Sequence, residues 1–322
     1  MARQCIGIDL GGTAIKFGLL DEDNSFSETI QRPTPTDRGG DGVVEQMVSG
    51  AGELLARARE KGDDVVGVGI GAPGPLRISE GVIVAMPNIP GMENLPLRDR
   101  VGEGLNLPAV LENDANAAAL GEFLRGAGET ADNMVLLTLG TGLGSGIIID
   151  GEILHGAHEM GAEIGHMIVQ PGGEKCGCGQ RGCLERYCSA KYLAHRAARR
   201  IREENITGPL ADVLGDKGEI DALEIERACE AGDDFAAQMW DEAVYYLAVG
   251  CVNICRIFDP DRIVLGGGLT GAGDVLTGPL QEHFERLHWS MAPPATEISL
   301  ARLGNDAGVV GAAGVAWRMF GR

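Results

Sequence analysis

The chain has 322 residues, of which 44% are hydrophobic, so it can bury a sizeable core and is long enough for two domains. It carries 27 basic and 47 acidic residues, and its net charge of −20 disfavours non-specific binding to nucleic acid or to an anionic membrane. Its apolar runs fall short of the ~20 residues of a membrane span, and the start MARQCIGIDLGG does not read as a signal peptide. We therefore expect a cytoplasmic protein with neither nucleic acid nor a membrane as its partner.

Apolar runs punctuated by glycine and proline alternate with helical patterns along the chain. The apolar runs predict strands at 4–10, 14–20, 65–70, 134–139, 145–150 and 262–266. The helical periodicity predicts helices at 42–61, 114–125, 184–204, 233–258, 273–287 and 307–320. Because strands and helices alternate, we expect an α/β fold.

The first predicted strand ends in a glycine-rich turn, DLGGTAIK. At Gly11, Gly12 and Thr13 the backbone can present its amides to an oxyanion, because glycine has no Cβ to block the approach. Lys16 would add positive charge, and Asp9 could hold a hydrated Mg²⁺ that bridges phosphate oxygens. An ordinary hairpin turn is the alternative to this phosphate site.

A polar cluster opens the predicted helix in the stretch LENDANAAALGEF. Asn113 or Asp114 can cap this helix by accepting hydrogen bonds from its first turn. Asp114 can also be a general base with Asn113 as its hydrogen-bonding neighbour, because phosphoryl transfer to a hydroxyl needs an acceptor for the proton. The two interpretations are compatible, since a helix start is a rigid platform.

Two later glycine turns resemble the first. The stretch LTLGTGLGSGIIIDGE (137–152) reads like GIDLGGTAIKFGLLDE (7–22), which indicates two related domains or, alternatively, two ordinary hairpins. A third turn, VLGGGL (264–269), follows a strand and could lie under a purine ring or a ribose. These turns are neither a GxxxxGK[ST] loop nor a GxGxxG that opens a helix. Together they fit a nucleotide held between two domains.

Three cysteines lie close together in the stretch CGCGQRGC, in the spacing CxCx₄C. With one histidine they would make a tetrahedral zinc site, and four protein ligands would leave it structural. His155 and His158 compete with His166 for the fourth position, and three packed free thiols are the alternative without metal. The ligands that we expect are Cys176, Cys178, Cys183 and His166.

Two carboxylates flank the expected zinc ligands. Glu163 precedes His166 by three residues, and Glu185 follows Cys183 by two. A metal that ties these loops together would fix both carboxylates towards one pocket. His166 could bind zinc through one ring nitrogen and donate to a substrate from the other. Such fixed donors and acceptors suit a polyol.

These motifs together resemble those of the ROK family of sugar kinases, within the actin-like ATPase superfamily, and most closely its bacterial glucokinases. The resemblance runs from IGIDLGGT to NDAGVVGAAGVAW, and its most specific part is HEMGAEIGHM followed by CGCGQRGCLE. GAPGPL, PNIPGMENLPL, ENDANAAALGE and LGTGLGSGI occur between them in family order. The resemblance implies two ribonuclease-H-like lobes with a cleft between them. The small lobe would hold residues 1–117 and the C-terminal helix 305–322, and the large lobe would hold residues 118–304 with a zinc-binding loop at 166–183.

The resemblance also implies a role for each motif residue. Asp114 would be the catalytic base. The sugar would be held by Gly71, Asn88, Asn113, Asp114, Glu163, His166 and Glu185. ATP and Mg²⁺ would be held by Asp9, Gly11, Gly12, Thr13, Gly140, Thr141, Gly142, Gly266 and Gly267, the last two facing the adenosine.

The implied activity is that of an ATP-dependent hexose kinase, a homodimer, that makes glucose 6-phosphate. Met92 stands where many family glucokinases carry an aromatic residue, and Ser145 stands where glycine is common. Other sugars therefore remain alternatives (N-acetylmannosamine, N-acetylglucosamine, fructose, allose), as do phosphoryl donors such as polyphosphate. A sugar-responsive transcription regulator is disfavoured, because the first predicted strand starts near residue 5 and leaves no room for a helix-turn-helix segment.

Overall fold

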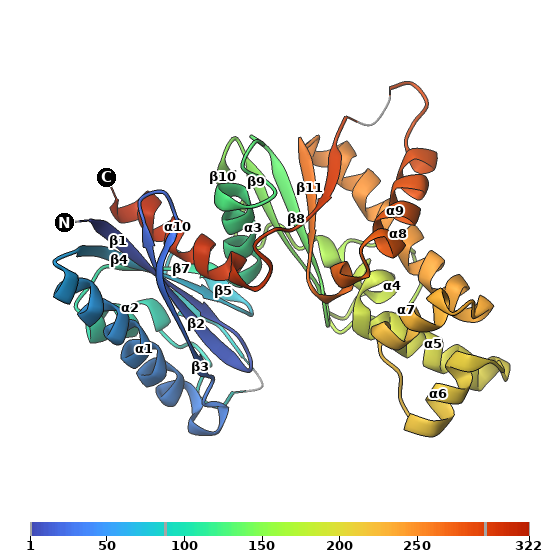
Figure 1. Ribbon diagram of the computed structural model, residues 1–322, viewed down its shortest axis with the longest axis horizontal. Coiled ribbons are helices and arrows are strands. Elements are labelled where there is room, and N and C mark those ends of the chain that lie inside the picture. The colour runs from blue at the N-terminus through green and yellow to red at the C-terminus, as the bar shows by residue number, and fades with distance from the viewer. Residues whose placement is uncertain (1, 87–88, 293–294, 322) are drawn as a thin grey trace. The chain divides into compact units, whose positions relative to one another are not determined.

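A computed structural model of the chain describes residues 2–86, 89–292 and 295–321 (Figure 1). It divides into two compact units. Unit 1 comprises Met1–Asp132, Gly146–Ala162 and Ala301–Arg322, and unit 2 comprises Asn133–Ser145 and Glu163–Leu300. The lobe boundary expected after residue 117 falls inside a helix that this division keeps whole in unit 1, and the functional lobes stay a prediction.

The strands form two five-stranded sheets and a small hairpin. The first sheet and the hairpin use β1 (Arg3–Leu10), β2 (Ala14–Asp21), β3 (Phe26–Pro33), β4 (Asp64–Ala72), β5 (Leu76–Arg77), β6 (Val82–Ile83) and β7 (Ala109–Asn113). The second sheet uses β8 (Met134–Leu139), β9 (Leu143–Ile149), β10 (Glu152–Ile153), β11 (Arg262–Gly266) and β12 (Glu297–Leu300).

The two large sheets share one topology. Their strand orders are β3-β2-β1-β4-β7 and β10-β9-β8-β11-β12, so corresponding strands appear in the same sequence order. In the first sheet β1 runs antiparallel to β2 and parallel to β4. In the second, β11 runs parallel to both β8 and β12. The predicted α/β class with two ribonuclease-H-like sheets is therefore confirmed, and the similar stretches 7–22 and 137–152 occupy corresponding places in the two sheets.

Ten α-helices occupy the described residues and account for most of the material outside the sheets (Figure 1). In chain order they are α1 (Gly39–Lys61), α2 (Leu97–Leu105), α3 (Asp114–Arg125), α4 (Glu185–Cys188), α5 (Ala190–Glu204), α6 (Pro209–Lys217), α7 (Ala222–Glu230), α8 (Asp234–Phe258), α9 (Asp274–Leu287) and α10 (Ala307–Phe320). The single helix predicted at 184–204 is two helices, because Ser189 has an extended backbone (φ −82°, ψ 152°).

The first sheet is covered on both faces, as Figure 1 shows for α1 and α10. Side chains alternate along β1: Ile6 and Ile8 join the core cluster that includes α1, whereas Cys5 joins the cluster that includes α10. Gly7 lies directly under the carbonyl of Val309, where a Cβ would collide. A glycine here lets α10 approach the sheet closely. This packing fixes the carboxyl end of β1, where Asp9 lies.

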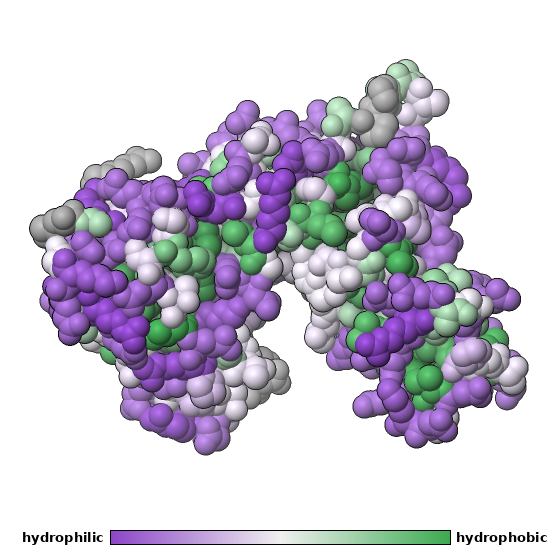
Figure 2. All heavy atoms as spheres, in the orientation of Figure 1, coloured by the Kyte–Doolittle hydropathy of each residue, from purple (hydrophilic) through white to green (hydrophobic). Residues whose placement is uncertain are grey.

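In unit 2 the long helix α8 packs against α9, α7, α4 and α5. The indole nitrogen of Trp240 donates to the carbonyl of Val275 at 3.0 Å and so links α8 to α9. None of the helices in the described part of the chain is long and apolar enough to cross a membrane. Hydrophilic side chains dominate the face drawn in Figure 2, as the 47 acidic residues lead one to expect.

Candidate functional site

At the start of α3, helix capping and the candidate general base fall on two different residues. Asn113 is the N-cap residue, and its Oδ1 accepts from the backbone N–H groups of Ala115 (2.9 Å) and Asn116 (3.1 Å). Capping is therefore done by Asn113. Asp114, the first residue of the helix, accepts from the backbone N–H of Ala115 at 2.8 Å. Burial raises the pKa of the Asp114 carboxyl.

Strand register brings three predicted residues to one edge of the first sheet. Asp9 on β1 is paired with Gly71 on β4, and Ala72 is paired with Asn113 on β7. Since these strands are parallel, their carboxyl ends meet at the same edge. A Cβ on Gly71 would lie 3.3 Å from the Cβ of Ala117 and 3.9 Å from the Cα of Asp114, so Gly71 packs against the start of α3.

Asp9 is close enough to Asp114 to feel its charge. The pKa of Asp9 is raised to about 6, first by burial and then by the charge of Asp114, while Lys16 opposes the shift. Two raised carboxyl pKa values at one edge are typical of a functional site rather than of a solvated surface. Lys16 itself donates to the backbone carbonyl of Asn305 at 2.6 Å.

The first glycine turn is open at Gly12 and Thr13 and closed by a hydrogen bond at Gly11. The N–H of Gly11 donates to the carbonyl of Ala14 at 3.0 Å, and a Cβ on Gly11 would lie 2.8 Å from that oxygen. Gly12 and Thr13 are exposed, and a Cβ on Gly12 would have open space around it. Thr34 ties the turn from outside by donating its hydroxyl to the carbonyl of Gly11 at 2.7 Å.

In unit 2 the other two glycine turns lie against each other. The N–H of Gly140 donates to the carbonyl of Gly142 at 3.0 Å, which closes the turn around Thr141. Gly267 has φ +87°, and a Cβ there would lie 2.5 Å from the carbonyl oxygen of Leu139. Glycine is needed at this position both for its backbone conformation and for the close approach. Gly266 is the buried last residue of β11, directly before this turn.

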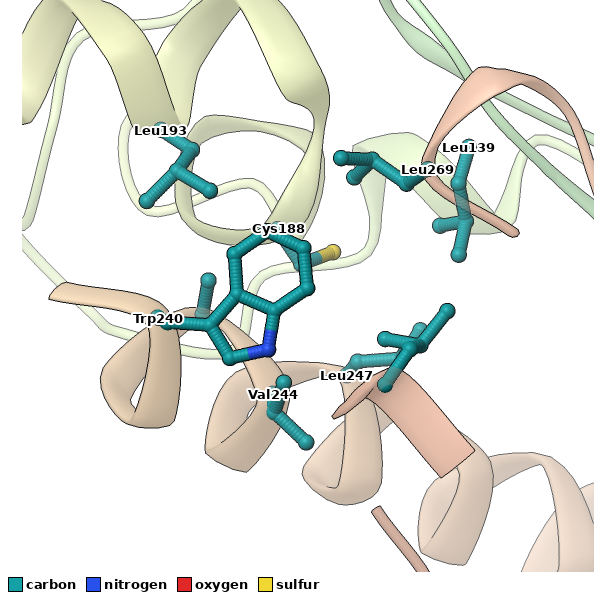
Figure 3. A pocket seen from close by; sticks show the side chains of 9 residues that line it. Leu139, Cys188, Leu193, Trp240, Val244, Leu247 and Leu269 are labelled. Atoms are coloured by element: carbon teal, nitrogen blue, oxygen red, sulfur yellow. The ribbon is translucent and has the colours of Figure 1, made fainter. Parts of the chain in front are cut away.

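A small apolar cavity lies beside the two glycine turns of unit 2, lined by residues of α8 and by leucines next to the turns (Figure 3). Leu139 and Leu269, one beside each turn, face Trp240, and Cys188 projects into the same space. The volume of about 10 Å³ would hold at most about one water, and the lining is apolar. We regard this cavity as part of the core under the turns and not as a ligand site.

The four predicted zinc ligands converge in unit 2. One ligand atom from each of them lies within 4.8 Å of all the others. The Nδ1 of His166 is 3.7 Å from the Sγ of Cys176, and the Sγ atoms of Cys178 and Cys183 are 3.6 Å apart. Tetrahedral zinc with Zn–S bonds of about 2.3 Å places its ligand atoms roughly 3.7 Å apart. The donor set and its spacing therefore fit zinc.

The carboxylates beside this cluster have different surroundings. One oxygen of Glu185 accepts from the N–H of Leu143 at 3.1 Å, and the other lies 3.9 Å from the Sγ of Cys176. Glu185 thus connects the cysteine cluster to the second glycine turn, a contact that the sequence did not predict. Glu163 is exposed. The next residue, Ile164, donates its N–H to the hydroxyl of the buried Ser145 at 3.1 Å.

Three further sequence predictions concern Asn88, Met92 and the two histidines that compete with His166. Asn88 lies outside the described residues. Met92, noted as a departure, is fully buried in the core of unit 1, so its side chain acts through packing. Two other histidines competed for the metal site. The Nε2 of His155 lies 2.7 Å from Oε2 of the buried Glu112, and His158 is exposed. This pair was missed, since the two residues are 43 positions apart.

Comparison with known proteins places these features in one family. Residues 5–318 match the ROK family. A glucokinase from Halalkalibacterium halodurans is 39% identical over 310 residues, which cover 96% of this chain and 93% of the relative. The fold is also similar to the ROK hexokinase from Thermus thermophilus, with a TM-score of 0.81, 35% identity and 96% coverage of both chains.

A second solved structure carries ligands. It is a ROK family glucokinase from Streptomyces griseus in complex with glucose and AMPPNP. The two chains are 36% identical with a TM-score of 0.76, and the match covers 97% of this chain and 98% of the other.

Proposed function

The chain belongs to the ROK family, and from that premise we propose that it is an ATP-dependent hexose kinase that converts glucose to glucose 6-phosphate. The relative named glucokinase and the glucose-bound structural neighbour support this choice of sugar. The observation that carries the proposal within this chain is the pair of half-buried carboxylates with raised pKa values, Asp9 and Asp114, at the carboxyl edge of the first sheet.

Asp114 is the proposed general base. The sugar hydroxyl oxygen attacks the γ-phosphorus of ATP, its proton passes to the Asp114 carboxylate, and the bond from the γ-phosphorus to the bridging oxygen breaks to release ADP. A base works best when its pKa lies near the operating pH, and burial moves the pKa of Asp114 in that direction. The helix start holds the carboxylate in place, which matters because positioning supplies much of the rate in phosphoryl transfer.

The glycine turns are the proposed nucleotide site. Around Gly11 the backbone N–H groups of Gly12 and Thr13, and around Gly140 those of Thr141 and Gly142, would face phosphate oxygens. The N–H groups of Gly11 and Gly140 are bonded within their own turns and would only shape them. Gly267 would leave room for the adenosine. Asp9 is the residue that would hold a hydrated Mg²⁺, which when bound supplies neutralisation of the phosphate charge.

We further propose that the cysteine and histidine cluster binds one structural zinc ion. Its four ligand atoms would complete a tetrahedral site with no open position, so zinc would serve the structure and not the chemistry. Glu163, His166 and Glu185 would bind sugar hydroxyls. The homodimer and the cytoplasmic location that the resemblance and composition imply stay predictions.

The test is a coupled ADP-release assay with ATP and Mg²⁺ over glucose, other hexoses and N-acetylhexosamines, repeated with polyphosphate as donor. We expect the highest turnover with glucose and ATP. Turnover that favours another sugar would keep the mechanism and reassign the substrate. No turnover with any pair of substrates would refute the kinase.

Asp114→Asn tests the base in the same assay. Because a positioned general base contributes about 10²–10⁴-fold, kcat should fall by that factor while glucose binding by calorimetry persists. Asp99→Asn, at an exposed position of α2, is the matched control and should behave as wild type. Substantial residual turnover in Asp114→Asn would remove this residue as the base.

A further inference from the structure

Glu112, at the end of β7, is a buried carboxylate directly before the proposed base. Its side chain is only 2% exposed. Oε1 accepts from the backbone N–H of Asn113 and from the side-chain amide of Asn116, both at 2.9 Å. Glu112 therefore fixes the first turn of α3 on both sides of Asp114.

The second oxygen of Glu112 faces a histidine from a distant segment. Oε2 lies 2.7 Å from Nε2 of His155, in the residues that follow β10. A buried carboxylate is costly unless an opposite charge or hydrogen bonds compensate it. The pKa of His155 is raised, first by its hydrogen bond to Glu112 and further by the charges of Glu112 and Glu159, while burial opposes this. The imidazole is thus biased towards the charged form that Glu112 needs.

The segment that carries His155 is itself tied down. The carbonyl of His155 accepts from the N–H of Gly161 at 2.9 Å, which closes the loop at its base. The carboxylate of Glu159 accepts from the backbone N–H groups of Ile78 (2.7 Å) and Ser79 (2.9 Å), just beyond β5. His155 is therefore held from both sides of the loop and meets Glu112 as a fixed partner.

We propose that Glu112 and His155 are a positioning pair for Asp114, an assignment that rests on the proposed kinase function. Glu112 orients the start of α3 through Asn113 and Asn116. His155 supplies the charge that allows a carboxylate to stay buried at that place. Both residues act through the first turn of the helix and not on the sugar.

Steady-state kinetics of four variants test the pair: His155→Gln, Glu112→Gln, the double variant, and His158→Gln as the exposed control in the same loop. We expect kcat to fall about 10- to 100-fold in both single variants, since misplacing a reacting group by about 1 Å costs up to 10²-fold. KM for glucose should change far less than kcat. The double variant should be no slower than the worse single variant, because both remove one interaction.

Several outcomes would overturn the proposal. A His155→Gln variant that loses thermal stability but keeps the wild-type kcat would make the pair purely structural. A change confined to KM would do the same. His155 is half-exposed, so its variant should fold even where Glu112→Gln does not.

An NMR titration of His155 separates this inference from the proposed function. In Glu112→Gln the imidazole pKa should fall towards about 6.5, its ordinary value. An unchanged titration would refute the pair whatever the activity. A wild type that turns over no sugar would instead refute the kinase, and the positioning role with it, even if the titration confirms the contact.

Discussion

Asp9 lies on β1 with its carboxyl largely removed from water, and its pKa is raised from 3.8 to about 6. The folded state therefore binds this proton more tightly than the unfolded state does. The associated stability is fully present below about pH 4 and is lost as the pH rises through about 6. Above pH 6 the protein holds a charged Asp9 at a cost in stability, which is expected of a residue kept for function.

Asp9→Asn should release this cost. Two pKa units correspond to about 2.7 kcal/mol, and partial exposure reduces the figure, so we expect the free energy of unfolding to rise by about 1–2 kcal/mol at pH 7.5. The gain should shrink towards zero as the pH falls to about 4, where the wild-type carboxyl is protonated too. Urea denaturation of both proteins at several pH values measures the difference.

Asp37→Asn, at an exposed position, is the control for that experiment, and its difference from wild type should stay flat with pH. If the difference in the free energy of unfolding between Asp9→Asn and wild type were the same at both ends of the pH range, burial would not be raising the pKa of this carboxyl. The same variant should lose kinase activity, because it removes the proposed Mg²⁺ partner. A gain in stability together with a loss of activity would mark Asp9 as functional.

At the scale of elements, the segment from Cys176 to Glu185 joins the proposed zinc site to a glycine turn. The cluster is built from Cys176, Cys178, Cys183 and His166, and Glu185 accepts from the N–H of Leu143. A segment with so many glycines buries little apolar surface of its own, so metal binding would supply its folding energy. Loss of the metal should therefore loosen Leu143 as well.

Cys178→Ser is the variant that tests this coupling. Zinc affinity should fall by more than about 100-fold, because losing a residue that only supports a metal ligand already lowers affinity by up to about 100-fold. Hydrogen exchange at residues 140–143 should become faster, because Glu185 is no longer held. Cys229→Ser, which lies outside the cluster, should keep both one zinc per chain and wild-type exchange. Wild-type protein that binds no zinc after refolding with the metal would refute the site.

The elements predicted from sequence are those with strong apolar patterns. Strands β1, β4 and β8 are buried along most of their length, and their apolar runs marked them. The edge strands β3 and β12 were missed because none of their residues is fully buried and many of their side chains are polar. Patterns of this kind also occur in loops, so only pairing with a neighbouring strand distinguishes them.

In the candidate site, the residues that are close in sequence were predicted and the long-range contacts were missed. The cysteine cluster was predicted because its ligands are close in sequence and zinc demands a known donor set. The contact from Glu185 to Leu143 spans 42 residues, and the pair of Glu112 with His155 spans 43. Such contacts depend on which strands become neighbours, and strand pairing cannot be predicted from composition or motif spacing.

At the scale of the whole molecule, the chain leaves unit 1 for the last time after Ala162 and returns to it at Ala301. Glu122 on α3 lies beside that return and is fully buried. Its carboxylate accepts from the N–H groups of Arg302 (3.0 Å), Leu303 (2.8 Å) and Ala127 (2.9 Å). One carboxylate therefore anchors the returning segment, which leads into α10, on the helix that carries Asp114.

Glu122→Gln should weaken this anchor strongly. The variant places an amide NH₂ group against backbone donors, and hydrogen bonds to a charged group are worth about 1.5–3 kcal/mol. Urea unfolding followed by circular dichroism should show that loss, and proteolysis should reach the segment around residues 301–306 faster. Glu129→Gln, exposed in the loop after α3, should stay within about 0.5 kcal/mol of wild type. Equal stability of the two variants would mean that packing of α10 alone holds the returning chain, since α10 contacts β1, β4 and α3 without help from Glu122.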